Sequence, residues 1–329
     1  MLKQAGAIAA LVLAGVGIAW AAAEPPPSKV EFTVRGPVRD DAKVQFGISY
    51  RHAGHGFSQS SRPVPAAELR GLSPVQLASP SGAPVNFQVI RDAGRLDCQG
   101  VARANSALGD CRFTPNAGFA AQLQSRGIGR PGNGELFTLA LEDVGLAYID
   151  ELQRQGYRRP TVAELVQAGQ HDAGLGYVRA MDRAGYRQKE LPTLIRLRDH
   201  DVGPRYIGEL AAFGYSRLPA DLVLKMRDHD VSARYVGELA DLGYRGLKPE
   251  SLVRLRDHDV SPAYVRELAG LGYRGLEPEI LVRLRDHDVS PGFIRRVAAR
   301  GAKPAPEELV RLRDRGEAGE TLAEAAEGR

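Results

Sequence analysis

A five-residue motif, Arg-Asp-His-Asp-Val, recurs along the chain at a constant interval. Its copies begin at residues 198, 227, 256 and 285, so each follows the last by 29 residues. Two further markers keep this interval without an insertion or deletion. They are the Gly-Tyr pairs at 156–157, 185–186, 214–215, 243–244 and 272–273, and the aromatic series Phe119, Tyr148, Tyr177, Tyr206, Tyr235, Tyr264 and Phe293. A fixed period of this length indicates a repeat architecture.

Each repeat is predicted to form two short helices. Pro249 suits the first turn of a helix, and Glu250 suits its electropositive end. Ser261 followed by Pro262 is typical of the start of a second helix, and Gly272 suits a left-handed helix end. Both helices carry apolar residues at helical spacing. One such hairpin buries little apolar surface, so we expect stacked copies that share one core, as in an α-solenoid.

The repeat pattern sets the expected limits of the helical domain. We predict an α-hairpin repeat domain over residues 115–315. Its last helix, Leu309–Asp314, resembles residues 281–286 at a spacing of 28, and Ala302 replaces the Gly-Tyr aromatic, which indicates a terminal cap. Residues 316–329 are small and acidic, and they are predicted to form a flexible tail.

Residues 24–114 differ in character and predict a β-rich domain. Alternating apolar residues over 30–34, 44–50 and 85–89 have the two-residue period of strands with one buried face. Two further strands, 95–102 and 107–114, flank a predicted hairpin loop. We expect a small, mostly antiparallel sheet of five or six strands, so the fold class is α+β.

The two cysteines, Cys98 and Cys111, lie symmetrically about that loop. In a regular hairpin they would face each other across the two strands, which allows a disulfide. The alternative is a pair of buried free thiols. A redox-active role is disfavoured because the chain has no Cys-x-x-Cys motif.

The first 23 residues predict a secretory signal peptide. Lys3 precedes an apolar stretch, and small residues at 21–23 suit a cleavage site. An uncleaved membrane anchor is the alternative. No other run is apolar enough to cross a membrane, so we expect a periplasmic or secreted protein. Its formal charge of +4 comes from interspersed signs, which does not favour a nucleic-acid partner.

A histidine recurs once per repeat, mostly between two aspartates. Imidazole and carboxylate groups suit zinc or copper, so a metal site in this column is one hypothesis. Each histidine is also predicted to lie at a helix C-terminus, where positive charge is stabilising, and neighbouring Arg and Asp can form ion pairs between repeats. We favour this structural ladder over a metal site. The column comprises His171, His200, His229, His258 and His287.

Ten of the eleven tyrosines fall on the two aromatic series. Tyr206 and its equivalents lie on the apolar face of the second helix, so we expect them in the core. The tyrosines of the Gly-Tyr pairs lie in links, and their hydroxyls could reach the surface. They are candidate contacts for a partner, although packing is the more common role: Tyr186, Tyr215, Tyr244 and Tyr273.

No catalytic motif is found in the sequence. His-Glu-x-x-His, Gly-x-Ser-x-Gly and the phosphate-binding glycine loop are absent. The glycine-rich stretch 127–134 lacks the Lys-Ser/Thr ending of such a loop and is predicted to link two helices. His52 and His55 could hold a metal, but nothing in the neighbouring sequence completes a ligand set. No cofactor is expected.

The repeat resembles an uncharacterised bacterial helical-hairpin repeat, with Asp-His followed by Gly or Asp, then Val-x-Pro and, further on, Gly-Tyr. Such segments are appended to some sensor-transducer metallopeptidases of the antibiotic-response type and also occur in stand-alone exported proteins. Residues Leu252–Tyr273 and their copies carry the resemblance. Where the family pattern often has Gly after His, this chain has Asp201, Asp230, Asp259 and Asp288. No peptidase motif is present, so the resemblance implies no protease activity.

The sequence therefore predicts an exported, non-enzymatic scaffold or binding protein. Its repeats would present an extended surface to a protein or peptide partner in the cell envelope. The alternative function is periplasmic metal binding through His200, His229, His258 and His287. An enzyme with its site in the β-rich domain is a third, less favoured possibility.

Overall fold

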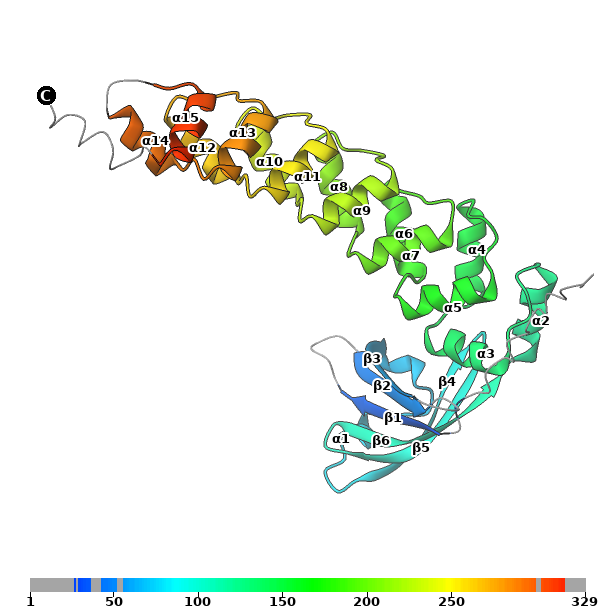
Figure 1. The fold of residues 1–329 in the computed structure, drawn as a ribbon. Helices are drawn as coiled ribbons and strands as arrows, with labels where there is room; N and C mark the ends of the chain where they lie inside the picture. Colours follow the sequence, from blue (N-terminus) through cyan, green and yellow to red (C-terminus); the bar gives the residue numbers. More distant parts are fainter. Residues whose placement is uncertain (1–26, 28, 37–42, 52–55, 300–302, 317–329) are drawn as a thin grey trace, which may run out of the picture. The chain divides into compact units, whose positions relative to one another are not determined.

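The computed structural model describes residues 27, 29–36, 43–51, 56–299 and 303–316. Contacts divide the chain into two compact units. The sheet domain comprises Met1–Val89, Leu96–Phe113 and Pro131–Phe137, and the repeat domain comprises Ile90–Arg95, Thr114–Arg130 and Thr138–Arg329. The predicted signal peptide and residues 317–329 of the predicted tail lie outside the described residues. The α+β class and the order of its parts are confirmed (Figure 1).

A six-stranded antiparallel sheet forms the first domain, in the spatial order β3-β2-β1-β6-β5-β4. A 3₁₀ turn at Ala66–Glu68 and a short helix, α1 (Pro74–Ala78), separate β3 from β4. The strands are β1 (Val30–Arg35), β2 (Lys43–Arg51), β3 (Phe57–Pro65), β4 (Ala83–Arg91), β5 (Gly94–Arg103) and β6 (Ser106–Pro115).

The sheet buries one face, as the alternating apolar residues predict. Its curvature shows in ring contacts between strands that are not neighbours. The rings of Phe32 on β1 and Phe87 on β4 are 4.8 Å apart, although two strands lie between them in the sheet. Gly109 on β6 makes this approach possible, because a Cβ there would lie 2.8 Å from the Phe32 ring. The sheet therefore curls around its own aromatic core.

Strand β3 is the one strand that the apolar pattern does not mark. Its sequence, FSQSSRPVP, carries two prolines, and only Val64 is fully buried. β3 is an edge strand, paired only with β2, and edge strands tolerate proline because one row of N–H groups has no partner strand. The pairing of Val44 with Val64 sets its register.

The repeat domain consists of helical hairpins that follow one another in sequence order (Figure 1). Its helices pack in two rows. The first helices of successive repeats contact each other in one row, and the second helices contact each other in the other. Residues 127–132 of the glycine-rich stretch 127–134 lie in the link between α2 and α3, as predicted, whereas residues 133 and 134 begin α3.

The helices of each row are nearly all nine residues long. The first α-helices are α2 (Ala117–Ser125) and α3 (Asn133–Leu141), and α3 begins in the sheet domain and ends in the repeat domain. One row then holds α5 (Val162–Gln170), α7 (Leu191–Asp199), α9 (Ala220–Asp228), α11 (Pro249–Asp257), α13 (Pro278–Asp286) and α15 (Pro306–Asp314). The other holds α4 (Leu146–Arg154), α6 (Leu175–Arg183), α8 (Pro204–Ala212), α10 (Ala233–Asp241), α12 (Pro262–Gly270) and α14 (Pro291–Ala298).

Local chemistry explains the helix ends. The Ser261 hydroxyl accepts a hydrogen bond from the backbone N–H of Tyr264, which caps α12. His258 ends α11, and Asp259 then takes a left-handed conformation with φ of 53°. Asp201, Asp230 and Asp288 do the same at φ of 50–54°. Aspartate tolerates this region better than most residues, so this turn forms without glycine.

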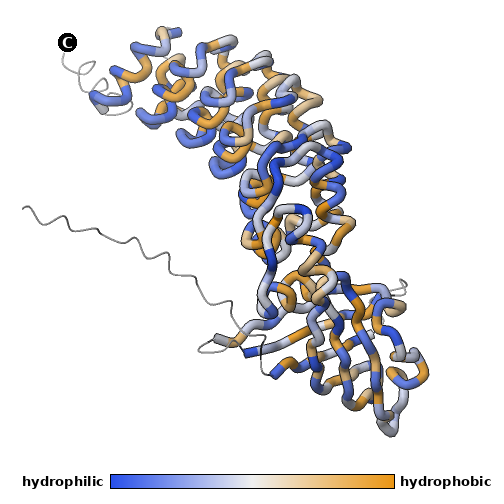
Figure 2. Tube along the Cα trace, turned by 90° about the vertical axis from the view of Figure 1, so that its right-hand side faces the viewer, coloured by the Kyte–Doolittle hydropathy of each residue, from blue (hydrophilic) through white to orange (hydrophobic). Residues whose placement is uncertain are grey.

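Apolar residues from both rows meet between them and form the core (Figure 2). Leu252 and Leu255 of α11 and Leu268 of α12 have no exposed surface. The equivalent leucines of the neighbouring repeats are equally buried, including Leu281 and Leu284. Successive hairpins thus share one continuous apolar core, as the constant period predicts.

Candidate functional site

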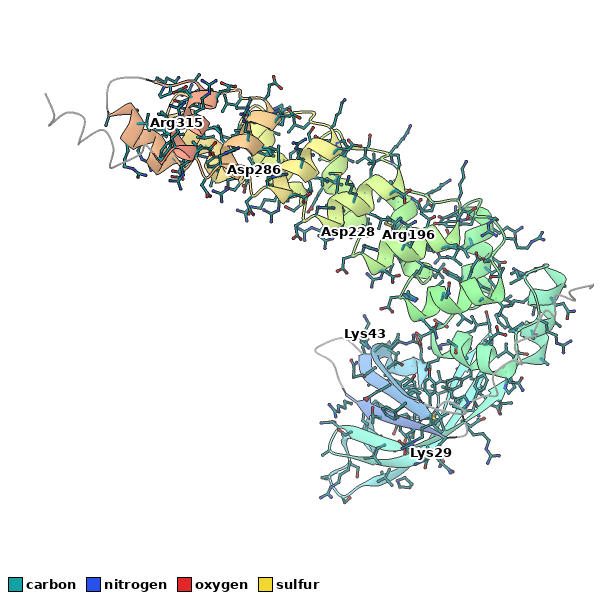
Figure 3. All side chains as sticks on the ribbon, viewed as in Figure 1. Lys29, Lys43, Arg196, Asp228, Asp286 and Arg315 are labelled. Carbon is teal, nitrogen blue, oxygen red and sulfur yellow. A yellow bond between two sulfur atoms is a disulfide. The ribbon has the colours of Figure 1, made fainter. Side chains whose placement is uncertain are left out.

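The histidine column forms a hydrogen-bonded ladder along the row of first helices. The Nδ1 atom of each histidine lies 2.5–2.7 Å from a carboxylate oxygen of the aspartate that ends the next first helix. An ionised carboxylate only accepts hydrogen bonds, so Nδ1 carries the proton. The pairs are His171–Asp199, His200–Asp228, His229–Asp257, His258–Asp286 and His287–Asp314. Figure 3 labels Asp228 and Asp286, two of these acceptors.

The predicted ion pairs between arginine and aspartate of neighbouring repeats occur at Arg196–Asp221 and Arg198–Asp172, at 3.0 and 4.0 Å. Arg256 does not bridge repeats through Asp257. Its guanidinium instead lies over the ring of Tyr235, 5.5 Å from the ring centroid. The arginines at 198, 227 and 285 stack in the same way on Tyr177, Tyr206 and Tyr264. Histidine therefore makes the pair that recurs from repeat to repeat, and the arginine of the motif makes a recurring cation–π contact.

A double-mutant cycle on His258 and Asp286 tests the ladder. The coupling energy should be about 0.2–1 kcal/mol, because both side chains are partly exposed. Urea denaturation followed by helix content measures it. The matched control is the pair His258 and Asp288, which do not hydrogen-bond and should show no coupling. Equal coupling in both cycles would contradict the ladder.

The described residues contain no group of three or more His, Cys, Asp or Glu side chains placed to hold a metal ion. In each ladder pair the Nδ1–H is directed at a carboxylate of the same chain. His52 and His55 lie outside the described residues. The metal hypothesis for His200, His229, His258 and His287 therefore gains no support from their geometry.

Tyrosines of the second helices tie each repeat to the next. The hydroxyl of Tyr235 donates a hydrogen bond of 2.8 Å to the carbonyl oxygen of Val260. The hydroxyls of Tyr148, Tyr177, Tyr206 and Tyr264 each donate to the carbonyl 25 residues further on. Tyr177 is half-buried and the others are buried. The expectation that this series lies in the core is met, and each hydroxyl has a fixed acceptor.

Raising the pH is expected to unfold the repeat domain. Burial raises the pKa of Tyr206 and Tyr264 from 10.0 to about 12. Below the ordinary pKa of 10.0 the tyrosines are protonated in both the folded and the unfolded chain, so their full contribution to stability is present. Above it the unfolded chain ionises first, so stability is lost as the pH rises toward the folded-state pKa. Helix content and tyrosinate absorbance should change in one cooperative step.

The control for this titration is the urea-unfolded protein, whose tyrosines should ionise gradually around the ordinary pKa of 10.0. A folded protein that ionised its tyrosines over the same range, with helix content unchanged, would show that burial does not shift these groups.

The tyrosines of the Gly-Tyr links also bond to the next repeat. The hydroxyls of Tyr186, Tyr215 and Tyr273 donate to backbone carbonyl oxygens at 2.7–2.8 Å. Tyr186 and Tyr273 are only 6% exposed, whereas Tyr215 and Tyr244 are half-buried. The structure thus gives Tyr186, Tyr215 and Tyr273 a packing role. Contact of all four tyrosines with a partner stays a prediction.

Cys98 of β5 and Cys111 of β6 form a disulfide, with their Cα atoms 4.0 Å apart. The two strands are joined by a tight turn in which Ala104 and Asn105 both have positive φ. This is the two-residue turn that best matches the twist of a hairpin. The predicted pairing of the cysteines is confirmed, and the alternative of free thiols is not seen.

A buried carboxylate connects α4 to α6. The side chain of Glu151 is only 6% exposed and accepts hydrogen bonds from Arg154, Gln155 and Arg179. These bonds, that from Arg154 above all, lower its pKa to about 2. Because its charge is paired on several sides, we assign Glu151 a structural role.

A groove between α8 and α10 is the feature of the repeat domain that the sequence did not reveal. It has a volume of about 710 Å³. Small residues form much of its wall, and the ring of Phe213, 41% exposed, lies over Gly237. A Cβ at position 237 would lie 2.6 Å from that ring. Arg205 and Arg234 flank the groove, each paired with a glutamate of its own helix at 2.7 Å.

The groove occurs where two repeats depart from the pattern of the others. Gly208 and Gly237 occupy a position that is arginine in three other repeats, at 179, 266 and 295, and aspartate at 150. Phe213 is also the only aromatic residue at its position in the series, where Leu242 and Leu271 follow. The residues that are constant between repeats pack the core. Gly208, Gly237 and Phe213 vary between repeats and change the surface of α8 and α10.

The described helices are all too short or too polar to span a membrane. Comparison of the chain with protein-family models, with curated protein sequences and with solved structures finds no match.

Proposed function

We propose that the protein is a non-enzymatic scaffold or binding protein whose repeat domain binds a protein or peptide partner through the groove between α8 and α10. The observation that carries this proposal is the exposed ring of Phe213 within that groove. An exposed aromatic residue beside small side chains is the usual anchor of a protein contact.

The constant columns support this choice by elimination. The histidines, the tyrosine hydroxyls and the arginines over the rings all make contacts between repeats. The polar groups of these side chains are therefore mostly occupied by contacts within the chain. Side chains that differ between repeats are therefore available for recognition of a partner. Phe213 and Gly237 are two such residues, and both line the groove.

The groove also limits the chemistry of the partner. An apolar side chain would bury against Phe213 and Ala212, which favours association through loss of exposed apolar area. Arg205 and Arg234 are 91% and 86% exposed, so their pairs with Glu209 and Glu238 are readily exchanged. A segment with an apolar residue next to an acidic one fits both features.

Affinity capture with matched variants tests the proposal. The bait is the full chain, and the extract is the cell envelope. A partner held by the wild-type protein should be lost with Phe213→Ala and with Gly237→Arg, which fills the groove. Gly208→Arg restores the same repeat residue in open space and should retain the partner. Capture that is indifferent to Phe213 and Gly237, or no capture, would reject the groove.

We further propose that the protein is exported and that residues 1–23 are its signal peptide. The disulfide supports this, because disulfides persist in oxidising compartments. We also propose that the repeat is related to the repeats appended to sensor-transducer metallopeptidases, which also occur in exported proteins. Mass spectrometry of the protein from cell fractions should find a first residue of Glu24 outside the cytoplasm. A retained Met1 in the cytoplasm would reject export.

A further inference from the structure

The sheet domain contains a second hollow, whose lining differs in chemistry from that of the groove between α8 and α10. Its volume is about 800 Å³, within the range of ~300–1,000 Å³ typical of small-molecule sites. Its polar walls come from three neighbouring strands, β4, β5 and β6, together with Arg70 and Lys29 at its margins. Lys29 is labelled in Figure 3.

Several side chains of this hollow have unused hydrogen-bonding capacity. Arg70, Asn86, Gln99 and Arg112 are exposed and make no side-chain hydrogen bond or ion pair with any other described residue. Alternation along the strands places Asn86, Gln99 and Arg112 on the same face. Four planar polar groups thus converge on one open space.

A hydrogen bond between neighbouring strands organises the floor of the hollow. Gln88 of β4 donates to Asp97 of β5 at 2.7 Å. The backbones of Arg70 and Gln88 also exchange hydrogen bonds of 2.9 and 2.8 Å, which fix Arg70 beside the hollow. These contacts hold the polar groups on regular structure and limit the entropy lost on binding.

The charges narrow the class of ligand. Asp97 and Asp110 oppose an anionic ligand, whereas Arg70 and Arg112 oppose a cationic one, and Lys29 is paired with Glu31. An apolar ligand would leave the amides and guanidinium groups without partners. Hydroxyl groups both donate and accept hydrogen bonds, so they can satisfy amide, guanidinium and carboxylate groups together.

We propose that this hollow binds a short, uncharged oligosaccharide. Its hydroxyl groups would receive hydrogen bonds from Gln99, Asn86 and Arg112 and donate to Asp110. The site is separate from the groove between α8 and α10 and uses only residues of the sheet domain.

Calorimetric titration of the full chain tests the proposal. The neutral probes are short oligomers of N-acetylglucosamine, of α-linked glucose and of β-linked glucose. An oligomer of galacturonate and one of glucosamine supply the acidic and basic comparisons. We expect saturable binding of at least one neutral probe. The variant Gln99→Ala with Arg112→Ala should weaken it at least about 10-fold, which corresponds to loss of ~1.4 kcal/mol.

Gln59→Ala is the matched control, because Gln59 is exposed on β3 outside the hollow. It should bind the neutral probe as the wild-type protein does, and thermal melts should show that all variants fold. The proposal is overturned if no neutral probe binds saturably, if an acidic or basic oligomer binds more tightly, or if the double variant binds normally.

Discussion

Replacing Tyr235 with alanine should lower the free energy of unfolding of the repeat domain by about 3–5 kcal/mol. The side chain is 5% exposed, its hydroxyl bonds Val260 at 2.8 Å, and the Arg256 guanidinium covers its ring. The substitution removes a large buried ring, its hydrogen bond and the surface on which Arg256 rests. Because each repeat contacts only its neighbours, the loss should spread to the repeats on both sides.

Tyr235→Phe separates the contribution of the hydroxyl hydrogen bond from that of the buried ring. It keeps the ring and leaves the buried carbonyl of Val260 without its donor, at a cost of about 1–2 kcal/mol. The surface variant Arg234→Ala, one residue away and 86% exposed, should change stability by no more than about 0.5 kcal/mol. Urea denaturation followed by helix content provides the measurement. A cost for alanine no greater than that for phenylalanine would show that the ring is not part of the core.

Removal of the disulfide, by Cys98→Ala with Cys111→Ala, should destabilise the sheet domain by about 3 kcal/mol. The bond closes a loop over a sequence separation of 13, and a loop of that length loses about this much chain entropy in the unfolded state. Hydrogen exchange should therefore become faster in β5 and β6. Exchange in α9 to α13 should stay unchanged, because these helices belong to the other compact unit.

The single variant Cys98→Ala serves as the comparison, since the bond is already lost with one cysteine. It should match the double variant within about 0.5 kcal/mol. Unchanged protection of β5 and β6 in both variants would mean that the hairpin does not depend on its disulfide. Equal acceleration in the repeat helices would mean that the two domains unfold as one.

The repeat domain could be predicted in detail because each of its signals occurs many times. Pro249, Ser261 and Gly272 mark helix starts and ends by mechanisms that act within a few residues. Helix length, order and the buried face follow from these local rules and the constant period. The partner of His258 could not be found in this way, because Asp286 lies 28 residues away and competes with two nearer aspartates.

Strand β3 shows where the apolar pattern fails. Its residues face solvent on one side and carry serine and arginine on the other, so the alternation of apolar and polar residues is lost. Edge position, which permits this composition, is a property of the assembled sheet. The same holds for the polar hollow, because the placement of Asn86, Gln99 and Arg112 together requires the register of three strands.

The sequence signal for the groove at Phe213 lies at positions that vary between repeats. Gly208 and Gly237 occupy a position that is arginine in three other repeats, and Phe213 occupies one that is Ala184, Leu242 or Leu271 in the neighbouring repeats. A repeat makes such departures visible, because the other copies show which residues the position otherwise holds. Deviations from the repeat, read as surface features, would have pointed to α8 and α10.

Deletion of one whole repeat tests the shared core most directly. Removal of residues 249–277 joins Lys248 to Pro278 and keeps the order of first and second helices. The account predicts a folded protein with a cooperative melt and a helix signal smaller by α11 and α12. Removal of residues 249–261, which takes α11 and the capping Ser261, should abolish the cooperative melt of the repeat domain because α12 loses its partner and its cap. Equal behaviour of the two variants, or unfolding after the whole-repeat deletion, would contradict a stack of interchangeable hairpins.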